Sequence, residues 1–226
     1  MGPMATIVAV SGCAPAVGVS TLARGLRDVF ARDQHVDLVE EDEVLTRPVF
    51  APMARELAVT GACGTATLAR CVTDFIRESA ASDYDVVVCD SLFPFVRSLS
   101  DWDNGEIAID GFLAECTEAI GLTPFTVVYL DADVRSALRH AAEREPAGWL
   151  VWYDTNLVRN ETAGAATELE LAVGVLEREG EIALRLMAKH GWDVRRIPET
   201  DLLNIVEVLD RAQRHLELAG VGADPS

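Results

Sequence analysis

The sequence predicts an α/β protein in which a parallel five-stranded sheet is flanked by helices in three layers (α/β/α). Short apolar, β-branched runs alternate along the chain with longer segments whose apolar residues recur at helical spacing. The alternation repeats about five times, and strands that are separated by helices pair in parallel. The chain has 226 residues, half of them hydrophobic, which is enough for one such domain.

Five short segments are the expected strands. Tyr84–Cys89 stands out because its Val-Val-Val-Cys run suits a central parallel strand, which is buried on both faces. The five expected strands are Thr6–Val10, Val36–Val39, Tyr84–Cys89, Phe125–Leu130 and Asp193–Ile197.

The segments between the strands carry helical stripes or turn signals. Leu45–Val59 contains two prolines, so we expect a loop with one or two helical turns, and we expect Ser91–Gly105 to be a loop. The expected helices are Ser20–Arg32, Thr65–Ala80, Gly111–Gly121, Val134–Arg144, Thr167–His190 and Leu202–Leu218. This predicts a single domain over residues 4–220, with a lid insertion at about residues 135–160 and a tail at 221–226.

Charge and composition limit the partners of this protein. A net charge of −18 repels nucleic acid and anionic lipid. No apolar run approaches the ~20 residues of a membrane span, and the start of the chain lacks the pattern of a signal peptide. The five cysteines are scattered without a C-x-x-C pair, so we expect a reduced, cytoplasmic protein without a disulfide framework or a zinc site.

The start of the chain has the strand–loop–helix order of a phosphate-binding loop, or P-loop. The pattern G-x-x-x-x-G-K-[ST] fits in the register that keeps Gly18 and Ser20, with Cys13 at the first glycine and Val19 at the lysine. Backbone N–H groups and a helix N-terminus can still hold phosphate here, but the lysine charge is missing. The residues expected to contact phosphate are Gly12, Cys13, Ala16, Val17, Gly18, Val19, Ser20 and Thr21.

Acidic residues follow three of the expected strands, at the edge where ligands bind in parallel sheets. Asp90 is placed to hold Mg²⁺ together with Ser20, although a helix-capping role is the alternative. Asp42 or Glu41 is the candidate for a base that takes a proton from an attacking hydroxyl. The alternatives for Asp42 are a solvated acidic turn and a helix N-cap.

Arginines are the candidates for the missing positive charge, since Lys189 is the only lysine in the chain. Arg135 and Arg139 lie four residues apart on one helical face, and Arg144 follows. Arginine binds phosphate oxygens two at a time and stabilises a phosphoryl group in transfer. The alternative is that these arginines are surface charges paired with nearby glutamates.

Three aromatic residues follow these arginines. Trp149, Trp152 and Tyr153 are candidates for stacking on a flat substrate ring, and anchoring of the insertion to the core is the alternative.

These features resemble the P-loop kinases of small molecules, the adenylate kinase-like group, and within it the nucleoside-kinase and chloramphenicol phosphotransferase type. The resemblance covers the chain from Thr6 to about Leu218. It is carried by Ser11–Leu22, Glu41-Asp42, Val86–Ser91, Val127–Asp131 with the arginine-bearing helix, and Asp193–Thr200.

The resemblance implies ATP or GTP with Mg²⁺ as cofactors and transfer of a phosphoryl group to a hydroxyl of a small molecule, such as a nucleoside or an antibiotic-type metabolite. It assigns the phosphate and magnesium contacts to Gly18, Ser20 and Thr21, the base to Asp42 or Glu41, and lid charges to Arg139 and Arg144, and it places Pro198 against the adenine. The alternative is a degenerate P-loop protein that binds a ligand or partner without catalysis. The sequence is compatible with a monomer and with a homodimer.

Overall fold

Five parallel strands form a sheet in the order β2-β3-β1-β4-β5, so β1 is central. The structure, a computed structural model, describes residues 4–101, 105–144, 168–200, 203–218 and 221. All five strands predicted from the sequence are present, with ends that differ by up to two residues. They are β1 (Thr6–Gly12), β2 (Val36–Val39), β3 (Val86–Asp90), β4 (Phe125–Leu130) and β5 (Asp193–Ile197).

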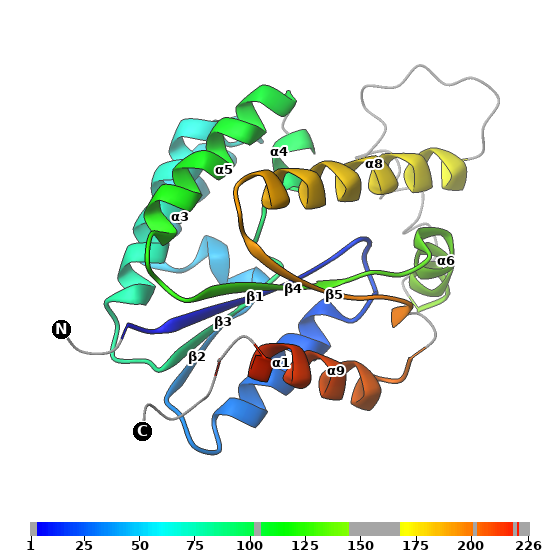
Figure 1. Cartoon of the computed structure of the whole chain (residues 1–226). Helices are drawn as coiled ribbons and strands as arrows, with labels where there is room; N and C mark the ends of the chain where they lie inside the picture. Colours follow the sequence, from blue (N-terminus) through cyan, green and yellow to red (C-terminus); the bar gives the residue numbers. More distant parts are fainter. Residues whose placement is uncertain (1–3, 102–104, 145–167, 201–202, 219–220, 222–226) are drawn as a thin grey trace.

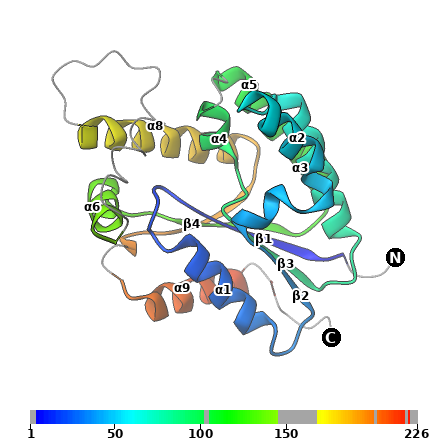
Figure 2. The same cartoon turned by 180° about the vertical axis from the view of Figure 1, so that it is seen from behind.

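Helices cover both faces of this sheet, so the protein has three layers, α/β/α (Figures 1 and 2). On one face, α1 and α9 pack over the alternate strand residues Val8, Val10, Val88 and Val128. On the other face, the strand residues that alternate with these four pack under α3, α5 and α8. This alternation is the period-2 pattern of a sheet covered on both sides, and it explains why the inner strands β1, β3 and β4 are mostly apolar.

The helices largely follow the prediction, with three differences in the first half of the chain. The helices are α1 (Val19–Phe30), α2 (Ala51–Thr60), α3 (Thr65–Ala80), α4 (Val96–Asp101), α5 (Glu106–Ile120), α6 (Val134–Arg144), α8 (Glu168–Lys189) and α9 (Ile205–Leu218), with the 3₁₀ helices η1 (Glu41–Leu45) and η2 (Pro48–Phe50).

The first difference is α2, which lies where the prolines predicted a loop. Pro48 and Pro52 fall in the first turns of η2 and α2, where the missing N–H group is not needed. The second is α4, which forms within the predicted loop Ser91–Gly105. The third is α5, which starts five residues before the predicted Gly111.

The topology places a crevice at the carboxyl ends of the central strands. β1 leads into α1 on one face, whereas β3 leads into α4 and α5 on the other face (Figure 2). Ligands of open α/β sheets bind where neighbouring strands send their connections to opposite faces.

In the part of the chain that the structure describes, no helix has the length and apolarity of a membrane span.

Candidate functional site

A cavity of about 710 Å³ lies at this carboxyl edge. Six parts of the chain line it: the loop between β1 and α1, η1, the segment after β3, β4, the end of α6 and one face of α8. The lining residues used below are Gly12, Cys13, Gly18, Val19, Ser20, Thr21, Glu41, Ser91, Phe93, Pro94, Phe95, Val96, Tyr129, Arg144, Leu176, Glu179, Gly180 and Ala183.

The loop after β1 closes on Gly12. A Cβ atom at Gly12 would lie 2.5 Å from Val17 Cγ2 and 3.0 Å from Val19 Cγ2, so the two valines pack directly onto this glycine. Val17 and Val19 also pack against the core under α1, which makes Val19 part of the loop's apolar inner side. Ala16 and Gly18 have left-handed backbones, with φ of 66° and 97°, and they turn the chain into α1.

The first turn of α1 has the features of an anion site. Gly18 precedes the helix without a side-chain cap, its carbonyl accepts the first helical hydrogen bond from Leu22 at 2.8 Å, and the first turn contains no acidic residue. Helix geometry leaves the N–H groups of Val19, Ser20 and Thr21 without a carbonyl of their own helix. These groups and the positive end of the helix dipole favour a phosphate group at the loop.

Cys13, at the position of the first glycine of the pattern, connects the loop to β4. Its N–H donates to the carbonyl of Leu130 at 3.0 Å, and its sulfur accepts from the N–H of Ala132 at 3.3 Å. Cys13 has no left-handed backbone, so this position does not require a glycine. Cysteine at the position of the pattern's first glycine is therefore compatible with the loop conformation, and its sulfur adds a contact to the residue that follows Asp131 after β4.

Asp90 ends β3 at the same edge and is only 2% exposed. It shares the side of β3 that faces α1 with Val86 and Val88, and its Oδ1 accepts a hydrogen bond from the Ser91 hydroxyl at 3.0 Å. The Asp90 carboxylate and the Ser20 hydroxyl are the oxygen ligands that Mg²⁺ prefers, so the donor chemistry fits this ion. Among the described residues no three His, Cys, Asp or Glu gather as a metal site, and Asp90, unlike Ser20, is not among the residues that line the cavity.

Only one of the two candidate bases reaches the cavity. Glu41 lines it, whereas Asp42 is exposed outside the lining. The N-cap of η1 is Glu40, not Asp42. Glu40 also binds Arg24 of α1 at 2.6 Å, and this raises the pKa of Arg24, with smaller contributions from the charges of Asp90 and Asp42.

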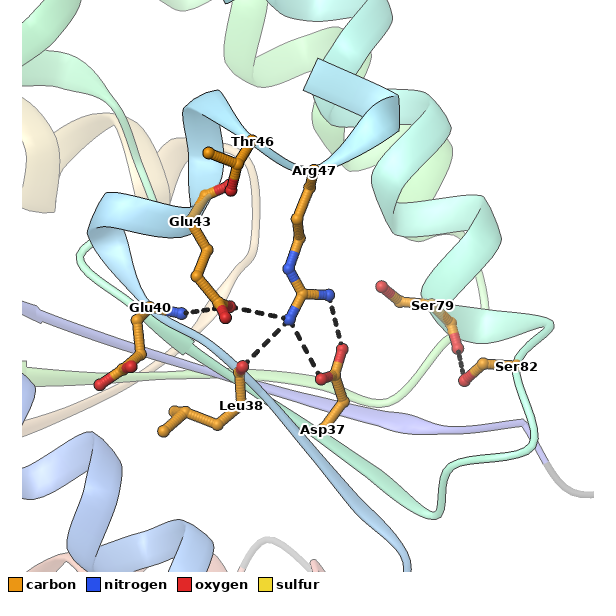
Figure 3. A network of polar contacts seen from close by, with 8 residues as sticks. All are labelled: Asp37, Leu38, Glu40, Glu43, Thr46, Arg47, Ser79 and Ser82. Carbon is orange, nitrogen blue, oxygen red and sulfur yellow. Dashed lines mark hydrogen bonds and ion pairs between the residues drawn. The ribbon is translucent and has the colours of Figure 1, made fainter. Parts of the chain in front are cut away.

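Arg47 holds the segment that carries Glu41 against β2 (Figure 3). Its guanidinium donates to both carboxylate oxygens of Asp37, at 2.8 and 3.1 Å, to the carbonyl of Leu38 at 3.0 Å and to Glu43 at 3.1 Å. The hydrogen bond to Asp37 raises the pKa of Arg47. Because a bidentate arginine–carboxylate pair is geometrically specific, it fixes the direction in which η1 leaves the sheet.

The three arginines of α6 have different surroundings. Arg135 forms a bidentate ion pair with Glu170 of α8, and Arg139 is exposed outside the lining of the cavity. Arg144, at the last position of α6, lines the cavity and is the one cation among the described lining residues. Asp133, directly before α6, caps the helix: its Oδ1 accepts a hydrogen bond from the N–H of Ser136 at 2.7 Å.

Two walls of the cavity were not predicted from the sequence. One is Phe93–Val96, which follows β3, and the other is the face of α8 formed by Leu176, Glu179, Gly180 and Ala183. The α8 residues follow helical spacing, but such a stripe is also the ordinary sign of core packing. Tyr129 of β4 also lines the cavity and is 2% exposed.

The remaining predicted site residues lie elsewhere. Val17 packs inside the loop and is not part of the lining. Pro198 is also outside the lining, and the chain after it is held by Thr200, whose N–H donates to the carbonyl of Asp131 at 3.0 Å. The part of the predicted lid that follows Arg144, with the aromatic residues Trp149, Trp152 and Tyr153, is outside the described residues.

Comparisons with known proteins leave the function open. No family model and no curated protein matches the chain. Among 89 matching chains of solved structures, one described as "Crystal structure of APE1195" is similar over 97% of both chains, with 16% sequence identity and a TM-score of 0.45. A likeness of this size carries no information about what either protein binds or does.

Proposed function

We propose that this protein is a P-loop-type phosphotransferase that moves a phosphoryl group from ATP or GTP, with Mg²⁺, to a hydroxyl of a small molecule. The observation that carries the proposal is the loop from Ser11 to Val19, because it opens into the same cavity as a carboxylate and an arginine. Phosphoryl transfer needs little covalent chemistry from a protein, so positioning and charge stabilisation are the main requirements.

Each requirement has a candidate residue. The N–H groups at the start of α1 would hold the donor phosphates, and Ser20 and Asp90 would hold the magnesium ion, which would neutralise charge on the phosphates. Arg144 would supply the cation that the loop lacks at Val19. Glu41 would accept the proton of the acceptor hydroxyl as its oxygen attacks phosphorus.

Phosphorylation assays on two matched variants test this assignment. Purified protein is incubated with ATP, Mg²⁺ and pools of hydroxyl compounds, and phosphorylated products are identified by mass spectrometry. With an acceptor found, Glu41→Gln is expected to lower kcat by about 10²–10⁴-fold, as for loss of a general base. Asp42→Asn, one residue away and outside the lining, is expected to retain kcat within about threefold. A larger loss in Asp42→Asn than in Glu41→Gln overturns the assignment of the base.

A second candidate function is binding without phosphoryl transfer. The observation that favours it is the charge of the cavity, where Arg144 is the one described cation beside two carboxylates, Glu41 and Glu179. Binding of ATP with no phosphorylated product from any pool supports this alternative.

A further inference from the structure

A second part of the cavity lining comes from the segment after β3 and from α8. The segment after β3 contributes Phe93 and Phe95, and α8 contributes Leu176, Gly180 and Ala183. Phe93 is 1% exposed and touches Phe95 and Phe125 edge-on, with ring centroids 6.0 and 5.3 Å apart. The wall is therefore part of the aromatic core, and its shape is set before any ligand binds.

Gly180 brings α8 next to the hydroxyl of Tyr129. A Cβ atom at Gly180 would lie 3.0 Å from Tyr129 Oη, so any larger residue would occupy the space in front of this hydroxyl. Gly174, on the same helix, is exposed and has open space at its Cβ position. Of these two glycines of α8, only Gly180 lies close to a neighbouring side chain.

Tyr129, which lies beside Ser11 of β1 in the sheet, supplies a neutral polar group to this part of the cavity. Burial raises the pKa of its phenol, so the hydroxyl keeps its proton and can both donate and accept a hydrogen bond. The one described cation of the lining, Arg144, is assigned to the donor phosphates in the proposed function. A ligand with its own phosphate would bring about −2 charges to a part of the cavity where the described residues offer no second cation.

We infer that Gly180 and Tyr129 form the acceptor-selecting part of the cavity, which takes an uncharged alcohol with a flat apolar body. The apolar body would contact Phe93, Phe95 and α8, and Tyr129 would bind a polar group of the acceptor. This inference rests on the proposed function, in which the loop holds the donor.

Binding of three probe compounds tests the inference. Benzyl alcohol, glycerol and phenyl phosphate are titrated into the protein with and without Mg²⁺ and a non-hydrolysable ATP analogue, and their dissociation constants are measured by ligand-observed NMR. Benzyl alcohol is expected to bind more tightly than either of the others. Tighter binding of phenyl phosphate or glycerol overturns the inference.

Matched variants locate the binding. Gly180→Val is expected to weaken benzyl alcohol binding about tenfold or more, and Tyr129→Phe about three- to tenfold for the lost hydrogen bond. Gly174→Val on the same helix is the control and should change nothing. Gly180→Ala serves as a milder variant if Gly180→Val does not fold, with a smaller loss in the same direction. Unchanged binding in the Gly180 and Tyr129 variants overturns the inference.

The nucleotide titrations in the same samples separate this inference from the proposed function. Wild-type protein that binds the ATP analogue but shows no effect of Gly180 or Tyr129 on the alcohol leaves the proposed function standing and removes only the inference. Wild-type protein that does not bind the analogue removes the proposed function.

Discussion

Replacing Gly12 with alanine is expected to disrupt the loop through packing alone. The new Cβ would lie 2.5 Å from Val17 Cγ2, about 1 Å inside the ordinary carbon–carbon contact of about 3.5–4.0 Å. It cannot move away freely, because Val19 Cγ2 and the carbonyl oxygen of Leu130 lie at 3.0 and 3.4 Å. Gly12 has no left-handed backbone, so conformational strain adds nothing.

The expected size follows from overpacking in cores, which costs about 1–3 kcal/mol. Urea unfolding is the assay, with Gly111→Ala as the control. Gly111 is an exposed position inside α5 with open space at its Cβ, so alanine there is expected to stabilise the fold by about 1 kcal/mol through helix propensity. ATP binding of Gly12→Ala should fall in parallel, because the same clash displaces the loop.

A double-mutant cycle identifies the cause. In Gly12→Ala/Val17→Ala the clashing methyl group is gone, so the two substitutions should together cost at least about 1 kcal/mol less than the sum of the single variants. Additive effects, or a Gly12→Ala protein as stable as Gly111→Ala, would refute the packing argument.

Three further predictions concern neighbouring parts of the structure. Cys13 is half-buried in the cavity whereas the other four cysteines are buried, so iodoacetamide should modify Cys13 first, and ATP with Mg²⁺ should slow this reaction, as followed by peptide mass spectrometry. Asp133→Ala should destabilise the fold by about 1 kcal/mol at pH 7 through loss of the α6 cap, as measured by urea unfolding. Hydrogen bonds from Ser136 lower the pKa of Asp133, so the cap stabilises the fold fully above about pH 3.9, the ordinary pKa of an aspartate. The difference in stability between the variant and the wild type should disappear as the pH falls through the lowered pKa. Arg47→Lys keeps the charge but loses the bidentate contact to Asp37, so calorimetric unfolding should show a lower Tm, and an unchanged Tm would contradict the anchoring role.

The sheet could be predicted from the sequence because its inner strands are buried on both faces. A parallel strand covered by helices is a mostly apolar run, as Val86–Cys89 and, apart from Thr126, Phe125–Leu130 are. The helices after them were harder to place. Proline favours a loop in the interior of a segment and is tolerated in the first turn of a helix, so Pro52 was compatible with both structures.

The lining of the candidate site could be predicted only where it follows directly from chain order. The loop from Ser11 and the acids after β2 and β3 lie at one sheet edge because parallel strands end there. The roles of the α6 arginines depend on partners that are distant in sequence, as Arg135 binds Glu170, 35 residues away. The α8 residues that line the cavity, including Gly180, recur at the same helical spacing as residues that face a core. Only the tertiary structure shows that this helix face lines a cavity.

Calorimetric titration of ATP and GTP, with and without Mg²⁺, tests the central claim that the loop and Arg144 together bind a nucleotide triphosphate. The account predicts magnesium-dependent binding with a micromolar Kd. It also predicts at least about tenfold weaker binding in Arg144→Gln, the loss expected for one charge-assisted phosphate contact, and an unchanged Kd in Arg139→Gln on the same helix. A folded wild-type protein that binds neither nucleotide, or equal losses in the two arginine variants, would contradict it.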